Sequence, residues 1–254
     1  MKNEIIFIFG GSGLIGKTLI KKLLTQNIII VNFDQKKTIF NNKNYNYINV
    51  NLENLNQLKI KIGLMIKKVG CPIKMVNCSY PNKSTLKNKL DFKKINLNEL
   101  TKTLTGHLGS YIVSSTMVLN EMRKRSMSGS IVLLSSIYGL KAQDLNIYKK
   151  TKILDSPIYA TIKGAINSYV KSACSMYAKN NININSLCPG GIENIDDKNF
   201  IDKQFYKNYI SKVPAKRFAN PEEISETILF LLDKKKSGYI NGTNLPIDGG
   251  MNIV

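Results

Sequence analysis

A glycine-rich turn directly after the first apolar run limits what this chain can fold into. The run Ile5–Phe9 leads into Gly10–Gly16 (GGSGLIG), and a segment with helical period follows. In a strand–turn–helix unit, the first glycine permits a tight turn, the second lets the backbone approach a pyrophosphate, and the third lets the helix pack on the sheet. Gly10, Gly13 and Gly16 hold these positions, and the following helix N-terminus favours the negative charge of a phosphate. The turn therefore indicates a dinucleotide site. Its predicted cofactor contacts are Gly10, Ser12, Gly13, Leu14, Ile15 and Gly16.

The same letters also fit a second kind of phosphate-binding loop, the one that binds nucleoside triphosphates. Gly16-Lys17-Thr18 follows Gly11 at the spacing that this loop requires. The turn alone leaves both interpretations open. Features farther along the chain favour the interpretation of the turn as a dinucleotide site.

Short apolar runs alternate with longer segments of helical period, and no repeat or linker divides the sequence. The predicted strands are Ile5–Phe9, Ile28–Phe33, Tyr47–Val50, Lys74–Asn77, Ser130–Ser135, Ile182–Leu187 and Thr243–Pro246. The predicted helices are Leu14–Thr25, Leu55–Lys68, Asn98–Lys124, Ile158–Lys179 and Pro221–Leu232. Strands that alternate with helices form parallel units with right-handed crossovers. We therefore predict a single α/β domain over residues 1–254, a doubly wound Rossmann fold with a parallel seven-stranded sheet and helices on both faces.

An acidic residue at the end of the second strand of such a fold binds the adenosine ribose of the cofactor. Asp34 lies near the expected spacing after Gly16. A free carboxylate repels the 2′-phosphate of NADP, so Asp34 favours NAD. Lys36 and Lys37 could neutralise that phosphate, so NADP stays open as the second cofactor. The alternative is that Asp34 is a solvated acid in a turn.

Tyr159 and Lys163 stand at positions i and i+4 near the start of a predicted helix and therefore share one face. A tyrosine with its ordinary pKa near 10 is a poor acid–base group at neutral pH, and a nearby ammonium lowers that pKa by favouring the phenolate. Ser136, at the end of the preceding buried strand, could hold a substrate oxygen. Two polar residues on one helix face are more often simply solvated, so this pattern alone is weak.

Six stretches of the chain, taken in order, match one known family. They are the glycine turn, Val76–Ser79, Ser135–Gly139, Tyr159–Lys163, Asn185–Ile192 and Tyr239–Gly250. Each stretch is common alone, whereas the whole set in this order is highly specific. Over essentially its whole length, the chain resembles the short-chain dehydrogenase/reductase family.

The resemblance implies a role for each matching residue. Tyr159 would be the general acid–base, Lys163 would tune its pKa and bind the ribose, and Ser136 would hold the substrate oxygen. The cofactor would be NAD, or NADP, and no metal is implied. The predicted cofactor contacts beyond the glycine turn are Asp34, Asn51, Asn77, Ser79, Tyr159, Lys163, Pro189, Gly190 and Ile192.

Three features depart from the common pattern of the family. The glycine spacing resembles that of its extended branch. His107 falls where the family usually has a catalytic asparagine, which helps to hold a water in a proton relay through tyrosine and lysine. An imidazole can also hold a water, and with its ordinary pKa near 6.5 it can carry a proton itself. The alternative is that His107 only packs inside the helix. The segment Leu140–Pro157 is longer than usual and would shape the substrate pocket.

The resemblance implies an NAD(P)-dependent oxidoreductase that interconverts a secondary alcohol and a ketone. The long segment, together with Asn77–Pro81 and Leu187–Asn194, is similar to a subset of the family. That subset occurs in bacterial gene sets for surface and flagellar sugars, including nonulosonic acids, so we expect a sugar or sugar phosphate as substrate. A 3-oxoacyl-thioester reductase is the second candidate, because it shares every core motif. A non-catalytic dinucleotide-binding regulator is a candidate of another class.

The formal charge of +20 raises the question of nucleic-acid binding. The arginines are confined to Arg123, Arg125 and Arg217, and the lysines are spread along the chain rather than gathered in one stripe. Lys, Asn and Ile all have AT-rich codons, so a biased genome explains the composition. We expect no nucleic-acid partner.

Composition also bears on location and assembly. The apolar runs are too short to cross a bilayer, the four cysteines have no C-x-x-C spacing, and a single histidine excludes a multi-histidine metal site. We therefore expect a cytoplasmic protein with no membrane partner and no metal. By the resemblance, helices Asn98–Lys124 and Ile158–Lys179 would form a dimer bundle, giving a homodimer or homotetramer.

Overall fold

The computed structural model describes residues 4–80, 96–151, 157–194 and 202–254 of the chain. Within them, seven parallel strands form one sheet in the order β3-β2-β1-β4-β5-β6-β7. The strands are β1 (Glu4–Phe9), β2 (Ile28–Asp34), β3 (Tyr45–Asn49), β4 (Lys74–Asn77), β5 (Gly129–Leu134), β6 (Ile182–Pro189) and β7 (Asn244–Ile247). The sheet confirms the predicted doubly wound α/β fold.

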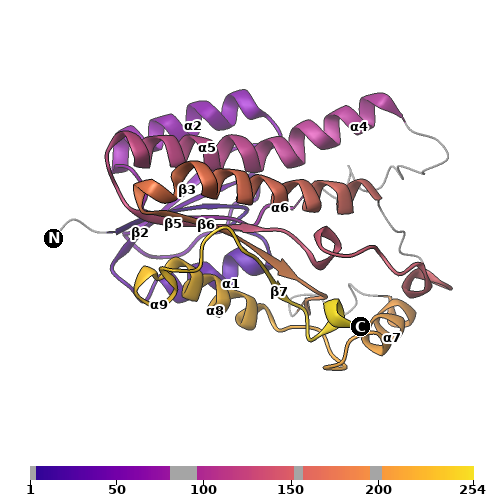
Figure 1. The fold of residues 1–254 in the computed structure, drawn as a ribbon. Helices are drawn as coiled ribbons and strands as arrows, with labels where there is room; N and C mark the ends of the chain where they lie inside the picture. The colour runs from indigo at the N-terminus through magenta and orange to yellow at the C-terminus, as the bar shows by residue number, and fades with distance from the viewer. Residues whose placement is uncertain (1–3, 81–95, 152–156, 195–201) are drawn as a thin grey trace.

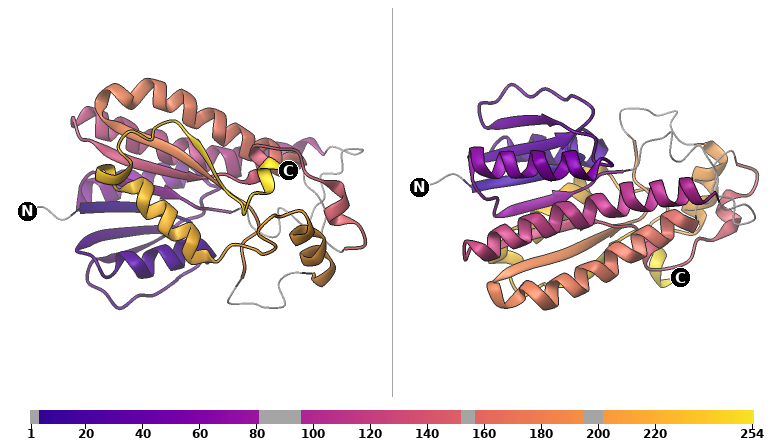
Figure 2. Two further views of the ribbon diagram at one scale, coloured as in Figure 1. Left: turned by 60° about the horizontal axis from the view of Figure 1, so that its bottom comes forward. Right: turned by 90° about the horizontal axis from the view of Figure 1, so that it is seen from above.

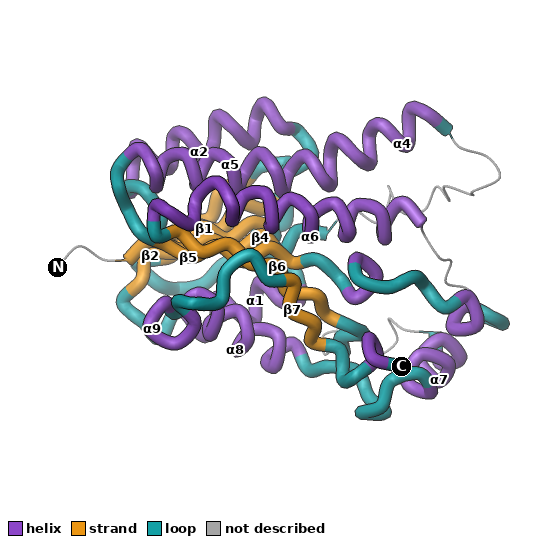
Figure 3. The backbone as a smooth tube through the Cα atoms, viewed as in Figure 1, coloured by secondary structure: helices purple, strands orange, loops and turns teal. Residues whose placement is uncertain are grey.

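Helices cover both faces of this sheet (Figure 1, Figure 3). The helices are α1 (Leu14–Leu23), α2 (Leu55–Val69), α4 (Leu97–Thr103), α5 (Gly109–Lys124), α6 (Pro157–Tyr177), α7 (Lys203–Ser211), α8 (Pro221–Leu232) and α9 (Lys234–Ser237). One face carries α2, α5 and α6, and the other carries α1 and α8. Figure 2 shows α5 and α6 side by side, where Ser115 Oγ donates to Tyr169 Oη at 2.8 Å and Tyr177 Oη donates to Asn120 Oδ1 at 2.7 Å.

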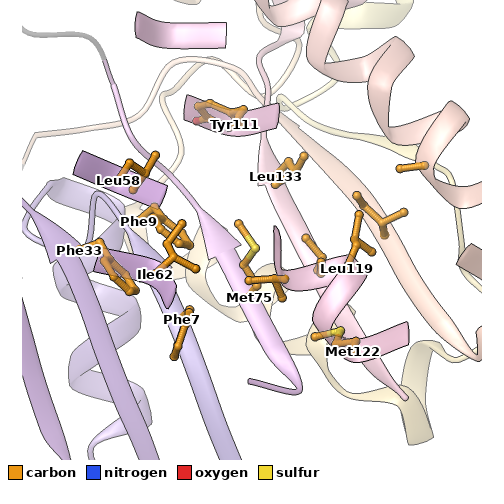
Figure 4. Close-up of a cluster of buried hydrophobic side chains, with 14 of the residues drawn as sticks. Phe7, Phe9, Phe33, Leu58, Ile62, Met75, Tyr111, Leu119, Met122 and Leu133 are labelled. Atoms are coloured by element: carbon orange, nitrogen blue, oxygen red, sulfur yellow. The ribbon is translucent and has the colours of Figure 1, made fainter. Parts of the chain in front are cut away.

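Successive residues of each strand face opposite helical layers, because side chains alternate along a strand. Phe7, Phe33 and Leu133 join the cluster beneath α2 and α5 (Figure 4). Ile8 and Val132 pack against α1 and α8 on the other face. The central strands are thus buried on both faces, which explains why they occur in the sequence as nearly continuous apolar runs.

Most predicted elements agree with the structure to within a few residues. Helix α8 begins and ends at the predicted residues, because Asn220 and Glu223 form a reciprocal capping box at its start. The sequence analysis missed α7 and α9. Helix α9 spans only four residues, which is too short for an apolar period. Helix α7 is mainly polar, but Phe205, Tyr209 and Ile210 fall on one face of it, and this signal was overlooked.

Residues 97–124 are helical throughout, in agreement with the predicted helix Asn98–Lys124, but the helix is not α-helical along its whole length. A π-helical turn at Leu104–Leu108 separates α4 from α5 and contains His107. A π turn adds one residue to a helix and is common at functional sites, but apolar periodicity does not reveal a single added residue. The turn also approaches the start of α2 closely, since a Cβ on Gly106 would lie 3.0 Å from Glu53 Cβ.

The sheet reverses its order of strand addition between β1 and β4. In open sheets of this kind the loops diverge at such a point, and ligands bind in the crevice at the carboxyl ends of the strands. Gly10 after β1 and Ser79 after β4 meet there, since a Cβ on Gly10 would lie 2.6 Å from Ser79 Cα. Gly10 also has a φ of +79°, which favours glycine.

None of the helices described is long and apolar enough to cross a membrane. The described part of the chain contains no group of three or more His, Cys, Asp or Glu residues that could hold a metal ion.

Two helical glycines are expected to respond oppositely to alanine. A Cβ on Gly16 would lie 2.4 Å from Gly11 Cα, so Gly16→Ala should push α1 away from the turn and cost about 1–3 kcal/mol of unfolding free energy. A Cβ on Gly63 in α2 meets nothing within 4 Å, so Gly63→Ala should gain about 0.5–1 kcal/mol from its higher helix propensity. Urea unfolding at equilibrium measures both changes. Effects of the same sign would contradict the close packing of Gly16.

Candidate active site

A cavity of about 810 Å³ opens where β1 and β4 diverge. Most of the predicted site residues line it, although they come from segments far apart in the sequence. These lining residues are Gly10, Ser12, Gly13, Leu14, Ile15, Asp34, Ser79, His107, Ser136, Tyr159, Lys163, Pro189, Gly190 and Ile192. The fold therefore gathers both predicted groups of residues, those assigned to the cofactor and those assigned to the chemistry, around one space.

Three predicted cofactor contacts, Gly16, Asn51 and Asn77, lie outside this lining. Gly16 packs inside the glycine turn. Asn77 is buried and accepts hydrogen bonds from the Ser79 amide at 3.0 Å and the Ser79 hydroxyl at 2.7 Å. Asn51 Oδ1 accepts a hydrogen bond from the Glu53 amide at 3.0 Å. In this structure Asn51 and Asn77 support residues of the lining, Glu53 and Ser79, rather than facing the cavity themselves.

Two side chains of β2 hold the glycine turn in place. Asn32 is fully buried, and its Oδ1 accepts a hydrogen bond from the Gly11 amide at 3.0 Å. Its Nδ2 donates to Ser12 Oγ at 3.2 Å and to Tyr45 Oη at 3.0 Å. Asp34 Oδ2 accepts a hydrogen bond from the Ser12 amide at 3.0 Å. The sequence analysis missed Asn32, although a polar residue inside an apolar strand is a usable signal, because buried polar groups need partners.

The lining fits a dinucleotide. Helix α1 begins after Gly13, and no side chain caps its first turn, so the N–H groups there are available to a pyrophosphate. Asp34 ends β2 at the cavity, and its second oxygen accepts a hydrogen bond from the Lys36 amide at 2.9 Å. The Lys36 side chain lines the same cavity. A carboxylate and an ammonium therefore both stand at the end of β2.

Ser136, Tyr159 and Lys163 converge on one wall of the cavity. Tyr159 and Lys163 project from the first turns of α6, and Ser136 follows β5 and hydrogen-bonds to Tyr159. Lys163 is buried, and its Nζ donates to the Leu134 carbonyl at 2.8 Å and lies 5.6 Å from the centre of the Tyr159 ring. This arrangement can hold an oxygen and exchange a proton with it.

Burial dominates the electrostatics of this wall. It raises the pKa of Tyr159, and the hydrogen bond with Ser136 only partly opposes this effect. Burial also lowers the pKa of Lys163 to about 7. In this structure burial governs the pKa values of both groups, and the lowering of the pKa of Tyr159 by Lys163 stays a prediction.

His107 lines the cavity from the π-helical turn and is 4% exposed. Its ring centre lies 6.5 Å from that of Tyr159, with an interplanar angle of 30°. Neither ring nitrogen has a hydrogen-bond partner among the described residues. Burial, with a smaller contribution from Lys163, lowers the pKa of His107 well below 6.5. Burial therefore disfavours the protonated imidazole, and a neutral ring still donates at one nitrogen and accepts at the other.

Several lining residues escaped the sequence analysis. Ser110 Oγ donates to the His107 carbonyl at 2.7 Å, and Tyr111 Oη donates to the Ser79 carbonyl at 2.8 Å. Both follow His107 by one helical turn, which is the signal that could have found them. Tyr80 also lines the cavity, directly after the predicted contact Ser79.

The long segment Leu140–Pro157 is described except for residues 152–156. Its described part contains a 3₁₀ turn, Leu145–Tyr148. After burial, Tyr148 is among the groups that raise the pKa of Tyr159, so this part of the segment lies near the active site. Its influence on the substrate stays a prediction.

Comparison with known proteins agrees with this geometry. The model of a family described as Enoyl-(Acyl carrier protein) reductase matches residues 65–252. The chain is 28% identical, over the whole of both proteins, to post-translational flagellin modification protein A of Campylobacter coli. It is 26% identical to a 3-oxoacyl-(acyl-carrier-protein) reductase of Buchnera aphidicola, covering 100% of this chain and 99% of that protein.

A solved structure has the same overall fold. The crystal structure of a short-chain dehydrogenase from Leptospira borgpetersenii with bound NAD+ superposes with a TM-score of 0.87 at 25% identity. The match covers 99% of this chain and 94% of that one. The chain therefore belongs to the short-chain dehydrogenase/reductase family, and it is an NAD(P)-dependent oxidoreductase that interconverts an alcohol and a ketone.

Proposed function

We propose that this enzyme oxidises or reduces a sugar or sugar phosphate of surface glycan biosynthesis. The observation that supports this substrate class best is the full-length similarity to a protein named for flagellin modification. The long segment Leu140–Pro157 supports it too, since it resembles that of family members from gene sets for surface sugars. A panel of sugar phosphates and nucleotide-linked sugars, offered with NAD and followed by NADH absorbance, tests the proposal. Turnover of thioesters alone would overturn it.

In the proposed mechanism, Tyr159 exchanges a proton with the substrate oxygen and Ser136 donates a hydrogen bond to the same oxygen. Pro189 and Gly190 would hold the nicotinamide ring of the cofactor, which when bound would supply the acceptor or donor of the hydride. Lys163 binds the ribose and, in its protonated state, stabilises the phenolate of Tyr159. Because Ser136 and Lys163 are buried, water competes little for the transferred proton.

Tyr159→Phe should abolish turnover and leave cofactor binding nearly intact, because only the proton-transfer group is removed. The expected fall in kcat is about 10²–10⁴-fold, the usual contribution of general acid–base catalysis. Calorimetric titration with NAD measures the binding. Tyr239→Phe is the matched control, since Tyr239 is fully exposed. A Tyr159→Phe enzyme that keeps more than about a tenth of the activity would exclude Tyr159 as the acid–base.

The proposed cofactor preference is for NAD over NADP. Asp34 stands at the end of β2, where a carboxylate can accept hydrogen bonds from the ribose hydroxyls and repel a 2′-phosphate. Lys36 opposes this preference, because its side chain lines the cavity nearby.

Asp34→Asn should narrow the difference in Kd between NAD and NADP by about tenfold, because it removes one charge from the ribose site. The amide oxygen of Asn can still accept the hydrogen bond from the Ser12 amide, which keeps the glycine turn, while the bond from the Lys36 amide is lost. Lys36→Ala should widen the difference in Kd between NAD and NADP, since it removes the cation that offsets the charge of Asp34. Fluorescence titration with both reduced cofactors measures the ratio. Tighter NADP binding by the unmodified enzyme would refute the preference.

His107 is proposed to hold the water that links Lys163 to solvent. This role is supported by the place of His107 in the family pattern and by its two ring nitrogens, which have no partner among the described residues. A neutral imidazole can act as donor and acceptor to such a water, as an asparagine amide can. His107 is thus a positioning residue for the relay rather than a proton carrier.

His107→Asn should keep turnover within about threefold, whereas His107→Leu should lose about tenfold or more in kcat with little change in NAD affinity. Since the imidazole is already neutral, the unmodified enzyme and His107→Asn should share one pH–rate profile between about pH 6 and 9. Thermal unfolding of each variant separates a packing defect from a relay defect. If His107→Leu turns over as fast as the unmodified enzyme, the relay role of His107 is excluded and only its packing role remains.

A 3-oxoacyl-thioester reductase remains the second candidate, because the full-length match to the Buchnera reductase favours it specifically. If this second candidate is right, the enzyme reduces acetoacetyl thioesters with NADPH as cofactor. The non-catalytic regulator is set aside, since the chain belongs to a family of enzymes and Tyr159, Lys163 and Ser136 are all in place.

We also propose a homodimer or homotetramer in the cytoplasm. Helices α5 and α6 lie side by side, and their outer faces carry the partly exposed apolar residues Ile112 and Met176. Light scattering of the purified protein measures the assembly directly.

A further inference from the structure

Tyr111 is a fully buried tyrosine that contacts three parts of the active site. It lies in the first turn of α5 and lines the cavity. Its hydroxyl donates to the Ser79 carbonyl at 2.8 Å. Its ring centre lies 5.7 Å from that of His107, with an interplanar angle of 61°. The third contact is with Lys163, which lies over the face of the Tyr111 ring.

The ammonium of Lys163 has a tyrosine ring on each of two helices. Its Nζ lies 5.1 Å from the centre of the Tyr111 ring in α5 and 5.6 Å from that of Tyr159 in α6. A cation within about 6 Å of an aromatic face is attracted by the negative charge of that face. The attraction is larger where water is excluded, and Lys163 is only 2% exposed. Both rings therefore favour the charged form of this lysine.

The groups that surround Lys163 carry no opposite charge at neutral pH. The titratable ones are Tyr111 of α5, Tyr159 of α6, His107 of the π-helical turn, Cys78 after β4 and Cys188 of β6. Burial raises the pKa values of these tyrosines and cysteines and lowers that of the histidine, so all of them favour their neutral forms. Among the described residues, no carboxylate forms an ion pair with Lys163. Its ammonium therefore depends on the Leu134 carbonyl, at 2.8 Å, and on the two rings.

We infer that Tyr111 is a positioning residue for proton transfer, because the face of its ring stabilises the Lys163 ammonium beside Tyr159. Tyr159 and Lys163 belong to one helix, whereas Tyr111 comes from a separate helix and holds the ammonium from the α5 side. Without the Tyr111 ring, the buried lysine loses part of what offsets its desolvation and gives up its proton more easily. The inference rests on the proposed role of Lys163 and adds the residue that keeps this lysine charged.

The test measures the protonation of Lys163 directly. An NMR titration of protein with a nitrogen isotope label in its lysines follows each Nζ signal, and Lys163→Met identifies the relevant signal by its absence. Tyr111→Leu should lower the pKa of Lys163 by about one pH unit, since a desolvated contact between a cation and a ring is lost. Tyr111→Phe keeps the ring face and should leave this pKa within about 0.3 pH units of its value in the unmodified enzyme.

Phe7→Leu is the matched control. Phe7 is a fully buried ring in the same hydrophobic cluster as Tyr111, and it lies outside the cavity lining. Its loss should destabilise the fold much as Tyr111→Leu does, and thermal unfolding measures both changes, but the pKa of Lys163 should stay the same. If Tyr111→Leu does not fold, Tyr111→Met repeats the comparison, because its flexible side chain fills more of the space and has no ring face.

Three outcomes would overturn the inference. One is a pKa of Lys163 in Tyr111→Leu equal to that in the unmodified enzyme. Another is an equal fall in Tyr111→Leu and Tyr111→Phe, which would assign the effect to the hydroxyl and its bond to Ser79 rather than to the ring. The third is a fall of the same size in Phe7→Leu, which would make Tyr111 a packing residue.

The pH–rate profile separates this inference from the proposed role of Lys163. Only the protonated lysine stabilises the phenolate of Tyr159, so kcat should fall as the pH rises through the pKa of Lys163. In Tyr111→Leu this fall should begin about one pH unit lower. If NMR shows the lowered pKa and the profile does not move, the contact between Tyr111 and Lys163 stands and only the proposed role of Lys163 fails. If the pKa is unchanged, the inference is wrong, whatever the profile shows.

Discussion

All seven strands run parallel, so every carboxyl end lies at the same edge of the sheet, and the rest of the molecule depends on this constraint. Where the strand order reverses between β1 and β4, the loops diverge and leave a cavity. Gly10 follows β1, Asp34 ends β2, Ser79 follows β4, Ser136 follows β5 and Pro189 ends β6. These residues meet because the strand ends meet. The same strand order therefore brings together the residues assigned to the cofactor and those assigned to the chemistry.

Burial then sets the chemistry of the residues that the topology gathers. Lys163 and His107 are both almost inaccessible, and loss of solvation moves both pKa values down, that of Lys163 to about 7. Burial raises the pKa of Tyr159 instead. The charged form of tyrosine is an anion, so loss of solvation favours the protonated side chain. A buried site of this kind favours the neutral forms of its titratable groups.

Local signals accounted for most of the fold. Helix α8 was predicted with its observed bounds, and the capping box at its start involves only the neighbouring positions Asn220 and Glu223. The π-helical turn around His107 was missed, because apolar periodicity does not reveal a single residue added to a helix. Asn32 was missed because its partners at the glycine turn lie far away in the sequence.

The sequence by itself determined the class of fold and the identity of most residues around the cavity. Glycine spacing, strand–helix alternation and the Tyr159–Lys163 pair are short-range patterns, and each reflects a physical requirement that acts over a few residues. Only the tertiary structure decided that Lys163 and His107 are buried, and with that the direction in which their pKa values move. The reason is that desolvation and contacts between segments depend on everything packed around a group, and no single stretch of sequence contains that information.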